Sequence, residues 1–322
     1  MIREEGVRVR IPASTANLGP GFDTMGMALS LYAWMEMKAS DQTTFHLHGD
    51  QMNGVPVDKS NLIYEVAQLV FREAGVHVPE IEVAMYSDIP LTRGLGSSAS
   101  AIVGGLAAAN ALIGFPLPQS KLFDMATAIE KHPDNVGASL YGGIITAVWD
   151  GSRAECLKII PDENLEVIVV IPDFQLSTSK AREVLPASLS MGDAIFNISR
   201  STLLATALAQ GRLDLIRTAM KDRLHQPYRA SLVPGMAEIL EHAPEHGALG
   251  AALSGAGPTV LALADRREGR SGELTRYLLE TMERSGIQAA ALQLLPDLEG
   301  VQLISQMQSL SFLDMIKGDV TI

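Results

Sequence analysis

The chain has 322 residues, of which 47% are hydrophobic and 19% are charged, a composition typical of a globular protein and unlike that of a disordered one. This length exceeds that of most single domains, so we expect two domains around a shared cleft. The formal net charge of −12 repels nucleic-acid phosphates and anionic lipid, and no run of lysine or arginine overcomes it locally. We therefore expect no nucleic-acid partner.

The cysteine count and the apolar segments of the sequence predict the compartment in which the protein acts. Cys156 is the only cysteine, which excludes an intramolecular disulfide and a cysteine-based metal cluster and favours a cytoplasmic protein. The first residues carry two glutamates where a signal peptide needs a basic and then an apolar stretch, so no export is expected. The run 97–114 is made largely of Ala, Gly and Ser, which is typical of a tightly packed buried helix, and we expect no membrane partner.

The first part of the chain predicts alternating strands and helices. Strands are expected over 7–11, 28–37, 43–47, 81–87, 142–149 and 165–171, and helices over 61–74, 99–112 and 119–130. The glycine and proline content of 12–23 predicts an irregular loop, and a turn over 131–135 ends the last helix. These elements predict a first domain over residues 1–172.

The second part predicts a domain of helices and strands over residues 173–322. Helical patterns cover 178–185, 193–210, 213–221 and 272–285, and strand patterns cover the two arms of 250–263 and the segment 288–294. Residues 301–322 are weakly patterned, so no structure is assigned to them.

The segment 94–98 (GLGSS) directly precedes a predicted helix. Glycines let a backbone approach phosphates closely, and the N-terminus of a helix presents unpaired N–H groups and the positive end of its dipole. Ser97 and Ser98 could simply cap this helix, or either hydroxyl could coordinate Mg²⁺ or a phosphate. The segment is neither a Walker A motif nor the G-x-G-x-x-G of dinucleotide-binding folds, so it predicts a phosphate loop of another class.

Two further glycine-rich segments, 12–23 and 253–259, accompany this loop. Together the three resemble, in the same order, the motifs of the GHMP kinase family, with 90–100 as its ATP loop P-x-x-x-G-L-G-S-S-A. Ser100 stands where that pattern usually has Ala, a change between two small residues. The resemblance implies an α+β fold with a ribosomal-S5-like N-terminal domain and a ferredoxin-like C-terminal domain, with ATP and substrate between them. It also allows a homodimer, since family members often dimerise.

Residues 10–23 and 130–135 resemble the homoserine kinase branch of this family, which implies phosphorylation of L-homoserine with ATP and Mg²⁺ in threonine biosynthesis. Lys131 departs from the pattern, because a glycine commonly stands there. The ATP-binding residues implied by the resemblance are Pro90, Leu91, Thr92, Arg93, Gly94, Leu95, Gly96, Ser97, Ser98, Ala99, Ser100 and Asn61. The substrate-binding residues are Asn17, Asp23, Asn135, Arg182 and Arg229, the metal ligands are Ser97 and Glu130, and the catalytic residues are Ser98 and Asn135.

The chemistry of the substrate supports part of this set. An amino acid carries an ammonium and a carboxylate, so its pocket needs an acid, for which Asp23 is available, and an arginine whose planar fork matches a carboxylate. Asn135 stands where mevalonate kinase-like members have Asp, and because an amide cannot accept a proton as a carboxylate does, we infer no dedicated side-chain base.

Structural roles remain open for the same residues. Asn17 and Asp23 could only stabilise turns, Glu130 could only end a helix, and both arginines could be solvated helix charges. Asn61 is by default a helix N-cap, and His132 is expected to be a structural hydrogen-bonding residue.

Two other functions also stay open. One is another GHMP enzyme, such as a mevalonate-pathway kinase or decarboxylase, whose substrate lacks an ammonium. The other is a non-catalytic sensor on the same fold, against which the intact Ser97, Ser98 and Glu130 argue.

Overall fold

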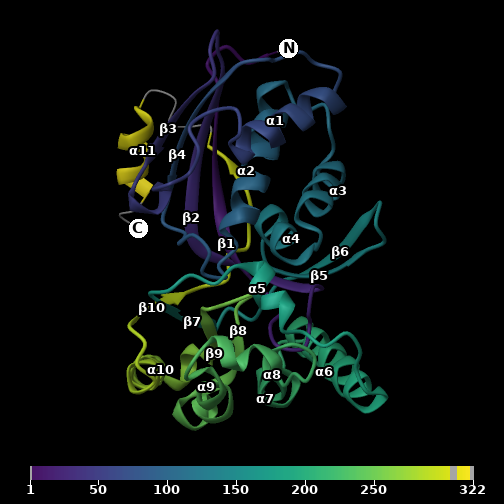
Figure 1. Cartoon of the computed structure of the whole chain (residues 1–322), viewed down its shortest axis with the longest axis vertical. Helices are drawn as coiled ribbons and strands as arrows, with labels where there is room; N and C mark the ends of the chain where they lie inside the picture. Colours follow the sequence, from purple (N-terminus) through teal and green to yellow (C-terminus); the bar gives the residue numbers. More distant parts are fainter. Residues whose placement is uncertain (1, 305–309, 320–322) are drawn as a thin grey trace.

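The computed structural model describes residues 2–304 and 310–319. Within these residues the strands form two sheets, one of seven strands and one of four, which follow one another along the long axis of the molecule (Figure 1). Both sheets carry helices, so the predicted α+β class is confirmed.

The larger sheet has the order β11-β1-β2-β4-β3, and the hairpin β5–β6 extends it from one end of β2. Its strands are β1 (Val7–Ala16), β2 (Met25–Ala39), β3 (Thr44–His48), β4 (Ile81–Ser87), β5 (Ile144–Trp149), β6 (Ala154–Ile159) and β11 (Gln302–Leu303). The long strand β2 pairs with β4 over 33–39 and with β5 over 25–27. Because β2 pairs with both strands, the sheet extends in two directions from it and lies against the helices described next.

Helices cover both faces of this sheet. They are α1 (Leu62–Glu73), α2 (Ser97–Leu112), α3 (Gln119–Glu130) and α4 (Asp134–Tyr141) on one face and α11 (Phe312–Asp319) on the other (Figure 1). Successive side chains of β2 point to opposite faces of the sheet, so Met35 lies in the main core while Trp34 packs against α11. A Cβ on Gly104 would lie 3.0 Å from Ile11, so the small residues of α2 allow close packing on β1. This agrees with the buried helix predicted there.

The smaller sheet has the order β10-β7-β9-β8 and is antiparallel throughout. Its strands are β7 (Leu165–Pro172), β8 (Ala248–Leu253), β9 (Val260–Asp265) and β10 (Ala289–Leu294). Its helices are α5 (Thr178–Glu183), α6 (Met191–Ala209), α7 (Ile216–Ala219), α8 (Gln226–Arg229), α9 (Met236–His242) and α10 (Ser271–Arg284). Because helices separate β7 from β8 and β9 from β10, the connectivity is the β-α-β-β-α-β of a ferredoxin-like fold, as predicted.

The loop predicted over 12–23 begins later than expected. Residues 12–16 belong to β1, which continues past Pro12 through an irregularity in its pairing with β2 between Pro12 and Ala13. The prediction of irregular structure there was wrong, because a strand tolerates proline at a bulge or other break in the ladder. The irregular segment that remains, 17–24, is short and tightly bonded.

The structure also adds elements that the sequence patterns did not indicate. Helix α4 begins at Asp134, so the last two residues of the predicted turn 131–135 are helical and that prediction was wrong there. Strand β6 pairs with β5. Of the weakly patterned residues 301–322, β11 and α11 are ordered against the larger sheet, and 305–309 and 320–322 lie outside the described residues.

The sheets divide the strands differently from the predicted domains. Strand β7 lies within the smaller sheet although it was expected to complete the first domain, and β11 returns to the larger sheet. Because the two sheets do not follow this boundary, the predicted division into domains 1–172 and 173–322 stays a prediction. In the described part of the molecule, no helix is both long and apolar enough to cross a membrane.

Candidate active site

A cavity of about 130 Å³ lies where the two sheets meet, and it is lined by all three glycine-rich segments, the turn 130–135 and the helices α5 and α8. The predicted site residues that line it are Asn17, Asp23, Thr92, Gly94, Gly96, Ser97, Ser98, Glu130, Asn135, Arg182 and Arg229. The predicted residues outside this lining are Asn61, Pro90, Leu91, Arg93, Leu95, Ala99 and Ser100. The fold thus gathers most of the predicted set from five separate stretches of chain.

Hydrogen bonds tie the three glycine-rich segments to one another. The Ser254 hydroxyl donates to the carbonyl of Gly94 at 2.6 Å, and the side-chain amide of Asn17 donates to the carbonyl of Gly255 at 2.9 Å. Asn17 also accepts the backbone N–H of Asp23 at 3.0 Å, which closes its own loop. Because each bond joins different segments or closes a loop, the cavity wall is held as one unit.

The loop before α2 requires its glycines. Gly94 and Gly96 have φ angles of 80° and 72°, in the left-handed region that favours glycine. A Cβ would lie 2.3 Å from the Ser254 carbonyl oxygen at Gly94 and 2.0 Å from the Ser14 hydroxyl at Gly96. The loop therefore enters α2 with its backbone close to the cavity, and the unpaired N–H groups of the first helical turn can bind an anion there.

Glu130 ends α3 and faces the start of α2. Its carboxylate accepts a hydrogen bond from the Ser98 hydroxyl at 3.1 Å. Burial raises the pKa of Glu130, and the neighbouring His132 and the Ser98 hydrogen bond offset this only in part. The Glu130 carboxylate bonds the Ser98 hydroxyl and lines the same cavity as Ser97, so these side chains provide the hard oxygen donors that Mg²⁺ prefers. The residues present thus fit a magnesium ion.

Asp23 and Arg182, expected to bind opposite ends of one substrate, bind each other in the structure. The two guanidinium Nη atoms of Arg182 donate to the two carboxylate oxygens of Asp23 at 3.0 and 2.8 Å. The ring of Phe22 lies 5.4 Å from the Arg182 guanidinium, which restrains it further. The ion pair of Asp23 and Arg182 lies at the cavity wall, and both side chains are still partly exposed.

Arg229 is far more buried than an arginine usually is, with 2% of its surface exposed. Its Nε donates to the carbonyl of Ala181 at 2.9 Å and its Nη1 to the carbonyl of Gly255 at 3.0 Å. Burial, and then the charge of Arg182, lower the pKa of Arg229 to about 10. Since Arg229 also lines the cavity, a negative group there would relieve both effects.

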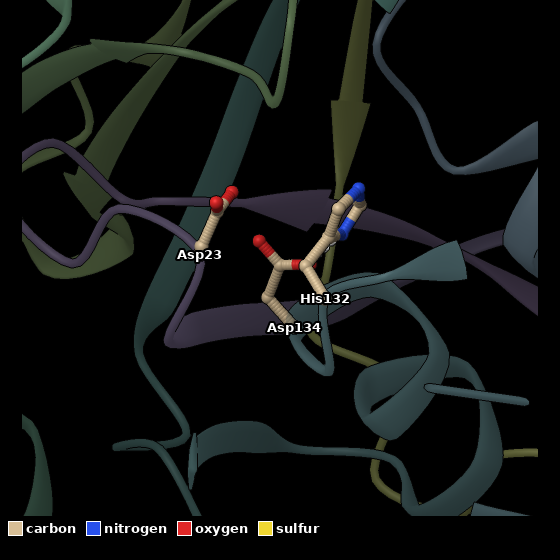
Figure 2. Close-up of side chains that lie close together, drawn as sticks. All are labelled: Asp23, His132 and Asp134. Atoms are coloured by element: carbon tan, nitrogen blue, oxygen red, sulfur yellow. Dashed lines mark hydrogen bonds and ion pairs between the residues drawn. The ribbon is translucent and has the colours of Figure 1, made fainter. Parts of the chain in front are cut away.

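Asp134, which the sequence analysis did not single out, lies beside His132 and Asp23 (Figure 2). His132 Nδ1 lies 2.8 Å from an Asp134 carboxylate oxygen, and the three side chains each offer a ligand atom within 4.8 Å of the others. Burial opposes protonation of His132, but the hydrogen bond and charge of Asp134, together with the charges of Glu130 and Asp23, outweigh burial and raise the pKa of His132. The position of Asp134 next to Asn135 in the motif was the signal that could have identified it.

The asparagines have different surroundings. Asn135 accepts a hydrogen bond from the Ser14 hydroxyl at 3.0 Å in the cavity wall. Asn61 instead caps α1, where its side chain accepts the backbone N–H of Ile63 at 2.8 Å. Lys131, the C-cap residue that follows α3, has a φ of 74°, which explains why glycine suits that position.

Several known proteins resemble this chain over most of its length. A model described as the GHMP kinases N terminal domain matches residues 61–143, and one described as GHMP kinases C terminal matches residues 204–286. A homoserine kinase of Deinococcus radiodurans is 47% identical over 87% of this chain and 91% of its own length. One of Desulfitobacterium hafniense is 43% identical over 92% of this chain and 100% of its own.

The arrangement in space agrees as well. A crystal structure of homoserine kinase from Cytophaga hutchinsonii superposes with a TM-score of 0.85 and 25% identity, covering 94% of this chain and 99% of that one. Both family models, the two relatives and the shared fold lead to one conclusion: the chain belongs to the GHMP kinase family.

Proposed function

We propose that this chain transfers the γ-phosphoryl group of ATP to the side-chain hydroxyl of L-homoserine, giving O-phospho-L-homoserine and ADP. One observation carries the proposal: a carboxylate and two guanidinium groups face the same cavity as the glycine loop and the N-terminus of α2. Curated relatives named homoserine kinase at 47% and 43% identity support it.

Recognition of the amino acid follows from charge. Asp23, with Asp134 nearby, suits an ammonium, while Arg182 and Arg229 suit a carboxylate. In the ligand-free cavity Asp23 and Arg182 satisfy each other, and a zwitterion can replace each partner with a group of the same sign. Mevalonate could take Arg182 from Asp23 but brings no ammonium to replace it, and galactose brings no charge that could replace either partner of this pair, so we expect both to be rejected.

Transfer itself needs positioning and charge stabilisation. Mg²⁺ held by Ser97 and Glu130 would neutralise negative charge on the transferring group. The first N–H groups of α2, at Ser97 and Ser98, stabilise phosphate oxygens, and Asn135 orients the attacking hydroxyl. No side-chain base is assigned, and the hydroxyl proton passes to phosphate or solvent as transfer proceeds.

The test is an ADP-release assay with Mg-ATP and L-homoserine, mevalonate or galactose. We expect turnover of homoserine in clear preference to the other two. Faster turnover of mevalonate would contradict the assignment of substrate, and ATP binding without turnover of any of them would favour a sensor. The cytoplasmic location and the homodimer stay predictions from the sequence.

A further inference from the structure

Arg229 is held by a third partner besides the two carbonyls described above. Its Nη1 lies 3.2 Å from Nδ1 of His225, one turn earlier in the chain. The bonds of Arg229 use Nε and Nη1, and within residues 2–304 and 310–319 no protein acceptor is bonded to Nη2. Since Arg229 lines the cavity, the position of its free nitrogen depends on how firmly the other two are held.

The imidazole ring of His225 contacts two separate parts of the chain, Arg229 and the loop of Gly19. The ring is fully buried, and its Nε2 lies 2.8 Å from the carbonyl oxygen of Gly19, in the loop that carries Asp23. The ring also packs against Phe22 of that loop, with the ring centroids 5.1 Å apart. One imidazole thus joins the loop of the predicted ammonium-binding residue to the predicted carboxylate-binding arginine.

These contacts determine the tautomer. A carbonyl oxygen can only accept, so Nε2 must carry the proton that it donates to Gly19. A guanidinium can only donate, so Nδ1 must offer its lone pair to Arg229. A doubly protonated ring would turn an N–H against the Arg229 N–H, which costs the bond and adds charge repulsion.

The charged groups around the ring agree with a neutral imidazole. Burial lowers the pKa of His225, Asp222 and the more distant Asp23 oppose this, and Arg229 adds to it, with a net lowering. The Asp222 carboxylate lies 3.7 Å from Nε2, the nitrogen that carries the proton, and it accepts the backbone N–H groups of His225 at 3.0 Å and Gln226 at 2.7 Å. Asp222 thereby fixes the backbone from which the ring projects.

We propose that His225 is a positioning residue for the amino-acid substrate: through Nδ1 it holds the Arg229 guanidinium, through Nε2–H it holds the Gly19 carbonyl, and it so fixes the separation between Arg229 and the loop of Asp23. The inference rests on the proposed function, since a fixed separation matters for a ligand that carries an ammonium and a carboxylate on one carbon. His225 itself is not among the residues that line the cavity, so it acts through Arg229 and the loop of Asp23.

Two substitutions separate the two nitrogens of the ring. In His225→Asn the side-chain oxygen lies near the Nδ1 position and can still accept from Arg229, whereas the bond to Gly19 is lost. In His225→Gln the amide reaches the Nε2 position and can still donate to Gly19, whereas the bond from Arg229 is lost. The matched control is His242→Gln, at an exposed histidine bonded to Glu245.

The measurement is steady-state kinetics with L-homoserine and Mg-ATP. We expect His225→Gln to raise the KM for homoserine by about tenfold or more, as for a lost hydrogen bond to a charged group, with the KM for ATP little changed. His225→Asn should show a smaller rise, and His242→Gln none. An unchanged homoserine KM in His225→Gln, or an equal rise of both KM values in both His225 variants, would overturn the inference.

A second measurement needs no substitution and no substrate. The ¹⁵N chemical shifts of the His225 ring in the whole protein should report a protonated Nε2 and a bare Nδ1. A protonated Nδ1 would refute the inference even if the variants failed to fold. Absence of homoserine turnover by the wild-type protein would instead contradict the proposed function, so the two failures are distinguishable.

Discussion

The glycine loop before α2 and the charged corner around Asp23 are built on different principles. The loop is contiguous, and backbone geometry shapes it: two left-handed glycines bring the chain into α2 under contacts that leave no room for a side chain. The corner is assembled from side chains far apart in the sequence, such as Asp23 and Arg182, which are 159 residues apart. A substitution in the loop should thus disturb both the fold and ATP binding, whereas one in the corner should act mainly on recognition of the amino-acid substrate and leave ATP binding nearly unchanged.

Glu130 lies where the glycine loop and the charged corner meet, and its substitution should have the largest effect. Glu130→Gln keeps the shape but removes the charge that Mg²⁺ prefers, so we expect kcat to fall about a hundredfold or more with the fold intact. Rates at several Mg²⁺ concentrations and a thermal melt are the measurements. The control is Glu155→Gln, at an exposed glutamate of β6. Near-normal activity at limiting Mg²⁺ would leave Glu130 as a helix-end residue.

Arg182 tests the corner. Lysine keeps the charge but cannot form a two-pronged contact, so Arg182→Lys should raise the KM for homoserine by roughly ten- to a hundredfold, lower kcat less, and leave the ATP affinity nearly unchanged. Arg212→Lys is the control, because Arg212 makes a similar two-pronged contact with Asp214 on the surface.

An analogue with its carboxylate reduced to an alcohol sharpens this test. The wild-type protein should lose much of its activity with the analogue, whereas Arg182→Lys should lose little more than it already has. Equal, additive losses in the two proteins would mean that Arg182 does not touch the carboxylate, and Arg229 would remain the candidate.

Gly94 tests the loop. Gly94→Ala adds a methyl group 2.3 Å from the Ser254 carbonyl at a φ of 80°, and we expect it to lower the free energy of unfolding by about 2–4 kcal/mol and to weaken ATP binding. Gly54→Ala is a matched control, since Gly54 has a φ of 82° but no atom within 4 Å, so its cost should be only about 1 kcal/mol. Equal costs at both positions would show that the close approach does not matter.

His132 should give the smallest effect. Because its folded-state pKa is raised above the unfolded value of 6.5, its bond to Asp134 stabilises the fold fully below pH 6.5, and this contribution is lost as the pH rises through the raised pKa. We expect denaturant unfolding to give a difference of about 1 kcal/mol between the wild-type protein and His132→Gln at low pH, narrowing at higher pH. A difference that does not change with pH would contradict the ion pair.

The contrast between the contiguous glycine loop and the charged corner, which is assembled from distant residues, also explains what could be predicted from the sequence. The glycine loop before α2 was predictable because glycines, serines and the following helix are adjacent in the chain. Helix α3 and strand β4 were predicted with the bounds they have. Strand residues 12–16 were missed because glycine and proline counts cannot show that a strand continues past an irregular pair. Strand β6 was missed because its exposed side makes the apolar pattern weak.

The arrangement of the charged corner could not be predicted. Asp23 and Arg182 were identified as residues, but their mutual ion pair depends on how α5 packs beside the first loop. His225 gave no separate signal, because it acquires its partner Arg229 only in the folded chain. Asp134 could have been noted from its place beside Asn135, but its contact with His132 is visible only in the structure.

The place of β7 has a consequence for experiments on separated parts of the molecule. Strand β7 ends at Pro172 and lies between β10 and β9. A gene cut after that codon would give a second fragment whose sheet lacks one of its two inner strands, exposing the edges of β9 and β10 to any extended peptide. Such a fragment should aggregate when expressed alone and become soluble when a peptide covering Leu165–Pro172 is supplied in trans.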